Sequence, residues 1–227
     1  MNTPKPDKTI DQLFEEFLAD QEARISPKTF EKYERIIDLY RSYLESYWPD
    51  HSGKEADAIT KARGTYCGTF GAEEITSAFC EFLDYFMPRK VIAGNETMKA
   101  AGTVIKKLAK WLVEKGYTED DESIREMVGE TARDLPASQK LLDRLDDWLA
   151  ENAPEEYERE VEGHFQIDRV EPGQLWLAPI LSGERKIGPI PVPEKVTRAC
   201  KVGWDVGCVV GKTAQGWRLV EVWNISP

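Results

Sequence analysis

The stretch that decides the fold of the first half of the chain is Ser26–Tyr47, which reads SPKTFEKYERIIDLYRSYLESY. Ser26 followed by Pro27 is typical of a helix start, because serine caps free amide groups and proline fits the first helical position. Apolar side chains then recur every three or four positions, at Phe30, Tyr33, Ile36, Ile37, Tyr40, Tyr43, Leu44 and Tyr47. This spacing predicts a long helix with one buried face that ends before Pro49.

A shorter helix is predicted before this stretch. Thr9 with Gln12 three residues later matches a capping box, and an apolar stripe follows at Ile10, Leu13, Phe14, Phe17 and Leu18. After the long helix, residues 50–71 contain four glycines and no sustained period. This segment is predicted to be an excursion or insertion.

Two more helices complete the predicted N-terminal domain. One runs from about 72 to 87 and is ended by Pro88, because the residue before a proline disfavours the helical conformation. The other runs from about 96 to 115 and stops at Gly116, a typical C-terminal cap. The four helices are predicted to form one bundle.

Beyond the bundle the composition turns acidic. Residues 121–160 carry 5 basic and 13 acidic side chains, so most of the net charge of −11 lies here. Apolar residues nevertheless keep helical spacing, at Leu141, Leu142, Leu145, Trp148 and Leu149. An acidic helical connector is therefore predicted, and Pro154 with the charge run Glu155–Glu162 marks its end.

After this connector the pattern changes to short apolar runs separated by glycine and proline. The runs predict strands at 165–170, 174–181, 186–190, 206–212 and 216–225, the last two forming a hairpin around residues 213–215. Five short strands in this length predict a small β barrel or sandwich. The fold class expected is α+β in separate domains: helices in 1–118, the connector in 119–160 and the β-rich domain in 161–227.

Composition limits the class of protein. A hydrophobic content of 41% with 31% charged residues is typical of a globular chain. No apolar run approaches the roughly 20 residues that cross a bilayer, and the polar start Met1–Asp7 is unlike a secretory signal. We therefore expect a cytoplasmic protein. Four scattered cysteines and two histidines show no metal-binding spacing, so no metal or cofactor is expected.

Basic side chains gather on two predicted helices. In the fourth helix Lys99, Lys106 and Lys110 lie opposite the apolar face, and residues 88–116 hold seven basic against two acidic groups. In the second helix Lys28, Lys32 and Arg35 lie away from the aromatic stripe, although acidic neighbours dilute their field. Each stripe is either a solvated helix face or a binding site for an anionic partner.

Several motifs of residues 8–118 match a known family in order and spacing. They are T-I-x-x-L-F-x-x-F-L from Thr9, S-P-K-T at 26–29 with Tyr33, E-I-T at 74–76, N-E-T at 95–97, and K-G-Y at 115–117. This region resembles the N-terminal core-binding (SAM-like) domain of tyrosine recombinases, the phage integrases. In that family the domain forms half of a clamp around duplex DNA, with its second and fourth helices facing the DNA.

The resemblance implies a set of DNA-contacting residues in this chain. They are Lys28, Thr29, Lys32 and Arg35 on the second helix and Thr97, Lys99, Lys106 and Lys110 on the fourth. Lysine and arginine contacts to phosphate supply affinity that is independent of sequence and falls with salt.

The catalytic part of that family is not recognisable. His164 is followed by Phe165, Gln166 and Ile167, where a His-x-x-Arg motif needs an arginine. Gly211-Lys212-Thr213 is no phosphate loop, because Val206 stands where its first glycine is required. We therefore expect no catalytic residues.

The sequence leads to one favoured function and two alternatives. The favoured one is a non-catalytic, recombination-associated DNA-binding protein whose β domain contacts nucleic acid or recruits a recombinase or other protein. Four tryptophans of this domain, Trp176, Trp204, Trp217 and Trp223, either stack on bases or pack in the core. The alternatives are a protein-interaction adaptor that has lost DNA binding, and an enzyme housed in the β domain, for which no nucleophile or metal set is found.

Overall fold

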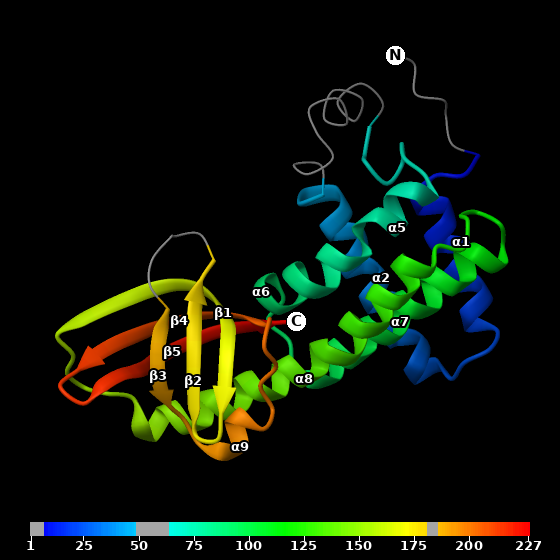
Figure 1. Ribbon diagram of the computed structural model, residues 1–227. Coiled ribbons are helices and arrows are strands. Elements are labelled where there is room, and N and C mark those ends of the chain that lie inside the picture. Colours follow the sequence, from blue (N-terminus) through cyan, green and yellow to red (C-terminus); the bar gives the residue numbers. More distant parts are fainter. Residues whose placement is uncertain (1–6, 49–63, 181–185) are drawn as a thin grey trace, which may run out of the picture. The chain divides into compact units, whose positions relative to one another are not determined.

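A computed structural model describes residues 7–48, 64–180 and 186–227 of the 227-residue chain (Figure 1). The protein is α+β, with helices in the N-terminal part and a five-stranded antiparallel sheet in the C-terminal part. It divides into two compact units. Unit 1 comprises Met1–Met87 and Glu96–Arg133, and unit 2 comprises Pro88–Asn95 and Asp134–Pro227. This division differs from the expected boundaries at 118 and 160, because one long helix contributes residues to both units.

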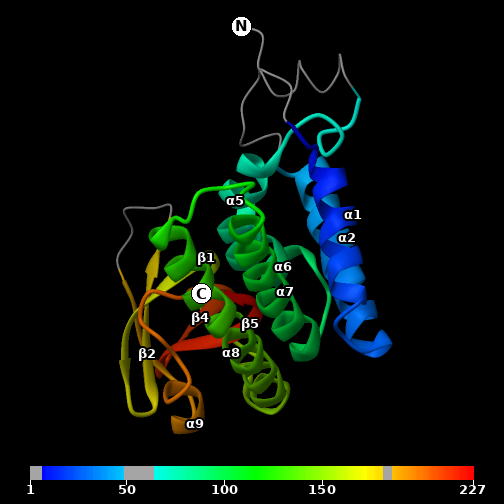
Figure 2. The same ribbon diagram turned by 90° about the vertical axis from the view of Figure 1, so that its right-hand side faces the viewer.

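The first two helices of unit 1 begin as the sequence predicts (Figure 2). In α1 (Ile10–Glu22) both halves of the capping box between Thr9 and Gln12 are formed. In α2 (Pro27–Ser46) the Ser26 side chain accepts a hydrogen bond from the Thr29 amide. Most residues of the predicted stripes are buried, Phe14, Phe17 and Tyr40 completely. Leu18 and Phe30 are only half-buried, and Tyr47 is 38% exposed.

The third predicted helix does not end at Pro88. It consists of α5 (Ala72–Glu81), a π-helical turn η1 (Phe82–Phe86) and α6 (Met87–Lys90). In the π turn the Met87 amide donates to the Phe82 carbonyl, five residues back. This wider turn shifts the hydrogen-bond ladder directly before the proline, so the missing N–H of Pro88 is tolerated.

The fourth predicted helix, α7 (Asn95–Glu114), ends at Gly116 as expected. Gly116 has φ +73°, and the amides of Gly116 and Tyr117 donate to the carbonyls of Val113 and Leu112. This is a Schellman cap, which needs a residue that adopts positive φ without strain.

Part of the predicted 50–71 excursion packs into unit 1. Residues 50–63 lie outside the described residues, whereas Tyr66 and Cys67 are completely buried. The two carboxylate oxygens of Glu45, on α2, accept hydrogen bonds from the amides of Tyr66 (2.9 Å) and Cys67 (2.8 Å). The Glu45 side chain therefore ties this segment to the helix.

The acidic connector is one helix, α8 (Glu122–Asn152), which contains Pro136. Its first half approaches α7 closely: a Cβ built on Gly102 would lie 2.8 Å from both the Cβ and the carbonyl oxygen of Ala132. Pro136 has no N–H to donate to this carbonyl, which in an unbroken helix would be its partner. The absence of a side chain at Gly102 is thus a condition for the contact between the two helices.

Gly102→Ala is expected to lower the free energy of unfolding by about 1–3 kcal/mol, since the clash with backbone atoms outweighs the gain in helix propensity. Gly129, in α8, is the matched control because a Cβ built there meets nothing within 4 Å. Gly129→Ala is expected to raise the free energy of unfolding by about 0.5–1 kcal/mol. Urea unfolding followed by circular dichroism measures both values, and equal effects of the same sign would contradict the close approach.

All five predicted strands are present: β1 (Arg159–Glu171), β2 (Gln174–Pro179), β3 (Ile187–Pro191), β4 (Asp205–Thr213) and β5 (Gly216–Ser226). A short helix, α9 (Glu194–Thr197), precedes β4. The strand order is β3-β2-β1-β4-β5 with antiparallel neighbours, and β4 and β5 form the predicted hairpin. β1 begins inside the expected boundary run, where Arg159–Glu162 pair with Lys212–Val209. These first residues of β1 face solvent on most sides, so they lack the apolar alternation of a strand.

The predicted barrel or sandwich is wrong. The five strands form one open sheet; its edge strands β3 and β5 approach each other, but no ladder joins them in the described part of the chain. The second half of α8 covers the apolar face of the sheet instead, because Leu141, Leu145 and Leu149 share one buried cluster with Phe165 and Val206. A helix face supplies the apolar surface that a second sheet would otherwise provide.

Candidate functional site

The eight candidate DNA-contacting residues all lie in unit 1. Lys28, Thr29, Lys32 and Arg35 are exposed on α2; on α7, Lys99, Lys106 and Lys110 are exposed and Thr97 is half-buried. The structure brings two of them to the same carboxylate near the N-terminal ends of the helices. Lys32 Nζ and Lys99 Nζ lie 3.7 Å and 3.4 Å from opposite oxygens of Glu96. The Glu96 carboxylate therefore neutralises part of the charge at the place where the two stripes meet.

Two other candidates lie further along α7, beside the start of α8. Lys110 Nζ forms a salt bridge with Glu114 (3.3 Å), whereas Lys106 has no salt bridge to any residue in the described part of the chain. On α2, Arg35 shares a shallow surface hollow with Glu31, Glu34 and Asp38. The dilution of the α2 stripe expected from the sequence is therefore present.

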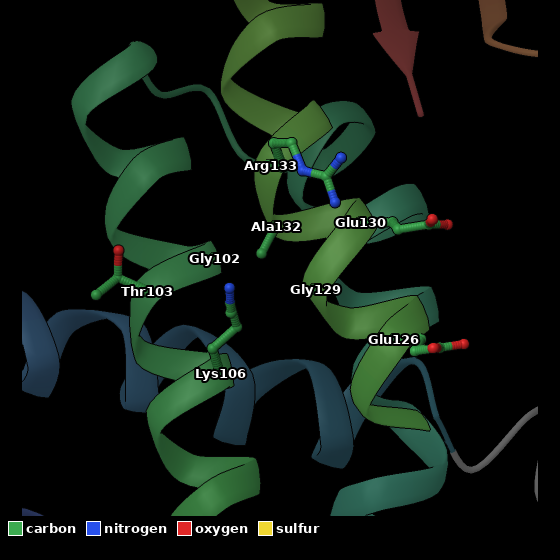
Figure 3. Close-up of a pocket in the computed structure, with 8 residues that line it drawn as sticks. All are labelled: Gly102, Thr103, Lys106, Glu126, Gly129, Glu130, Ala132 and Arg133. Carbon is green, nitrogen blue, oxygen red and sulfur yellow. The ribbon is translucent and has the colours of Figure 1, made fainter. Parts of the chain in front are cut away.

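The space between α7 and the first half of α8 contains two hollows, which we call the α7–α8 groove. The first hollow, of about 600 Å³, is lined by Gly102, Thr103, Lys106, Glu126, Gly129, Glu130, Ala132 and Arg133. Figure 3 shows Lys106 reaching up between the two helices, while Glu126 and Glu130 project from the side of α8 that faces away from α7. Lys106 also lines the second hollow, so the two are neighbours.

The second hollow, of about 410 Å³, has apolar lining from both helices, at Ala109, Val113, Ile124 and Val128. Lys106, Lys110 and Arg125 lie around it together with four carboxylates, those of Glu114, Glu119, Asp120 and Asp121. Arg125 is already paired with Asp120 (2.5 Å). The Asp121 carboxylate accepts hydrogen bonds from the Ser123 hydroxyl and from the Ser123 and Ile124 amides, and these hydrogen bonds cap α8 and lower the pKa of Asp121.

One lining residue of the second hollow carries a buried polar atom. The Thr118 hydroxyl oxygen is inaccessible to solvent and has no hydrogen-bond partner among residues 7–48, 64–180 and 186–227. Sequence reasoning missed this groove, since the projection of the fourth helix singled out neither Ala109 nor Val113. Only the packing of α8 against α7 turns them into the floor of a hollow.

In unit 2 the tryptophans differ in their surroundings. Trp204 is 4% exposed and belongs to the core, as one of the two sequence interpretations predicts. Trp176 and Trp217 are half-buried, and each lies under a cation: Arg169 at 4.6 Å and Lys212 at 5.3 Å from the ring centroid. These pairs stabilise the sheet surface through cation–π attraction.

A polar cluster lies on the side of the sheet away from the core. His164 is paired in register with Gly207, which is paired with Asn224, and Arg89 forms a salt bridge with Asp205 at 3.3 Å. Burial and the nearby Arg89 guanidinium lower the pKa of His164, against a smaller opposite effect of Asp205. Burial raises the pKa of Asp205.

This lowered pKa of His164 predicts that the protein loses stability as the pH falls below about 6.5, because the unfolded chain takes up the proton first. The raised pKa of Asp205 acts at lower pH and with the opposite sign, since the folded form then binds the proton more readily. The urea midpoints at pH 7.5 and 5.5 are expected to differ more for the wild type than for His164→Gln. An unchanged difference in the variant would exclude His164 as the cause.

The cysteine thiols are poor nucleophiles. Burial raises the pKa of Cys67 and Cys208 well above the ordinary range and that of Cys200 to about 12, so these thiols stay protonated at neutral pH. Among the residues that the structure describes, no three His, Cys, Asp or Glu side chains are grouped to hold a metal ion. No described helix is long and apolar enough to cross a membrane.

The fold and the groove define an α+β protein with a charged, partly apolar surface groove on its helical unit. In comparisons with protein families, curated proteins and solved structures, no match to the chain was found. The likeness to the core-binding domain of phage integrases therefore stays a prediction from the sequence motifs.

Proposed function

We propose that this chain is a non-catalytic protein-interaction adaptor whose helical unit does not use its fourth-helix lysines to bind DNA. The observation that carries the proposal is the position of Lys106 and Lys110. Both line a hollow that is also lined by the acidic link Glu119–Asp121, which leads into α8. A basic stripe that serves DNA needs an open face, and here carboxylates stand beside it.

Electrostatics supports this choice. Duplex DNA carries one phosphate charge per about 1.7 Å of its axis, so a carboxylate near the contact surface repels it. Around the groove, the carboxylates of Glu119, Glu126 and Glu130 have no salt bridge to any described residue. Of the cations that line the groove, only Lys106 and Arg133 have no salt bridge to a described residue. The net charge of −11 for the whole chain adds to the repulsion at low salt.

The non-catalytic part of the proposal is supported by the chemistry of the described residues. The three most buried thiols are protonated at neutral pH. The groove offers lysines, arginines and carboxylates but no histidine, cysteine or serine with an adjacent base.

The adaptor proposal is tested by affinity capture with the intact chain before and after nuclease treatment, followed by a Kd measurement between the chain and the purified captured protein. A partner that survives the nuclease and binds with a Kd of about 10 μM or tighter is the expected result. Capture that disappears with the nucleic acid would contradict the adaptor.

A second candidate function, duplex-DNA binding, is favoured by one observation. Lys32 and Lys99 both form salt bridges with Glu96 near the N-terminal ends of α2 and α7, and the N-terminus of a helix attracts phosphate. Any DNA contact would then centre on Lys28, Lys32 and Lys99, and not on Lys106 and Lys110.

Fluorescence anisotropy of a labelled random duplex at 50 and 200 mM salt separates the two candidates. The adaptor predicts no binding at tens of micromolar protein. Salt-sensitive binding that is lost in the triple variant Lys28→Ala/Lys32→Ala/Lys99→Ala and kept in Lys106→Ala/Lys110→Ala would establish the second candidate instead.

A further inference from the structure

We propose that the α7–α8 groove is the docking site for a lysine- or arginine-rich amphipathic segment of a partner protein, which inserts an apolar side chain into the second hollow. The inference rests on the proposed adaptor function and names the chemistry of its partner. The lining of the groove comes from α7, α8 and the link between them, together with Thr76 of α5, and all of these residues belong to unit 1.

The shape of the second hollow fits an apolar anchor. Its volume of about 410 Å³ is bounded by aliphatic side chains of α7 and α8, Val113 and Ile124 among them. Interfaces gain most of their affinity from a few apolar or aromatic side chains that enter such pockets and exclude water. The hollow is therefore suited to one or two large side chains of a partner.

The charges around the groove select a cationic partner. The Lys110 and Arg125 side chains are already neutralised by Glu114 and Asp120. The two hollows together are lined by four cations and six carboxylates, so the groove has a net charge of −2 even though Lys106 and Arg133 have no salt bridge to any described residue. The carboxylates of Glu119, Glu126 and Glu130 have no such salt bridge either, and Figure 3 shows the last two on the side of α8 away from α7. Lysines flanking an apolar anchor would pair with these carboxylates, whereas an acidic segment would meet repulsion.

The test uses a fluorescein-labelled peptide of about twelve residues. Its leucines recur every three or four positions, so they form one face of a helix, and lysines fill the other positions. A scrambled peptide of the same composition and a peptide with glutamate in place of lysine are the comparison probes. The intact chain is expected to bind the lysine–leucine peptide at least about tenfold more tightly than either comparison probe. Equal binding of the scrambled peptide would reduce the effect to unspecific charge attraction and overturn the proposal.

Two variants locate the binding. Ala109→Phe fills the second hollow and is expected to weaken peptide binding about tenfold or more. Ala100→Phe is the matched control, since Ala100 is a half-buried alanine of the same helix that lines neither hollow. The surface variant Glu126→Lys/Glu130→Lys, which removes no buried contact, is expected to weaken binding to a similar extent. Unchanged affinity in both the filled and the charge-reversed variants would place the peptide elsewhere.

The outcomes also separate this inference from the adaptor proposal. If a captured protein binds the wild type and Ala109→Phe with the same affinity, the inference that the groove is the docking site is wrong and the adaptor proposal stands. If the peptide binds in the groove but capture yields only nuclease-sensitive material, the groove is a docking site and the adaptor proposal is wrong.

Discussion

Replacing Leu145 by alanine is expected to lower the free energy of unfolding of unit 2 by about 2–5 kcal/mol. Leu145 is 2% exposed and lies in one cluster with Phe165, Ile167 and Val206 of the sheet. The substitution removes buried apolar surface and leaves a cavity that the neighbouring strands fill only in part. Tryptophan fluorescence during urea unfolding reports mainly on unit 2, because this unit holds Trp148, Trp176, Trp204, Trp217 and Trp223, whereas unit 1 holds Trp48 and Trp111.

Arg144→Ala is the matched control for Leu145→Ala. Arg144 precedes Leu145 in α8 but is exposed, so its removal is expected to change the free energy of unfolding by less than about 0.5 kcal/mol. A small effect of Leu145→Ala, equal to that of the control, would mean that the second half of α8 is not part of the core of unit 2.

Replacing Glu45 by alanine is expected to lower the free energy of unfolding of unit 1 by about 2–4 kcal/mol. The substitution removes two hydrogen bonds to a carboxylate and leaves the backbone amides of Tyr66 and Cys67 buried without acceptors. Urea unfolding followed by circular dichroism measures the change.

Two further variants test the cause of this loss. Glu34→Ala removes an exposed carboxylate from the same helix and is expected to leave stability within about 0.5 kcal/mol of the wild type. Glu45→Gln keeps one acceptor oxygen and is expected to lose less than Glu45→Ala. Glu45→Ala with the stability of the wild type would show that the 64–70 segment does not depend on this anchor.

The eight candidate residues show which features of the site a helix projection can predict from the sequence. It placed the side chains of Lys28, Lys32 and Lys99 on exposed faces, as the structure has them. It did not reveal that Glu96 lies between Lys32 and Lys99, because that contact joins two helices that are distant in the sequence. Nor did it reveal the carboxylates that line the same hollows as Lys106, which come from α8 and from the link before it.

By itself the sequence determined the elements whose signals are local. The caps at Thr9 and Ser26, the stop at Gly116 and the hairpin of β4 and β5 involve residues within a few positions of one another. Such hydrogen bonds and backbone preferences act over one turn, so they are legible without knowledge of the rest of the chain.

Only the tertiary structure decided which element covers the apolar face of the sheet and where a groove forms. The leucines of α8 at 141, 145 and 149 read equally well as the face of a connector and as the core of a sheet. Gly102 reads as a weak point of a helix until Ala132 is placed against it. Both contacts depend on which surfaces meet across long sequence separations. The physical reason is that the hydrophobic effect is non-directional, so an apolar face is stabilised by any complementary apolar surface. Close packing of the whole chain then selects one of these surfaces.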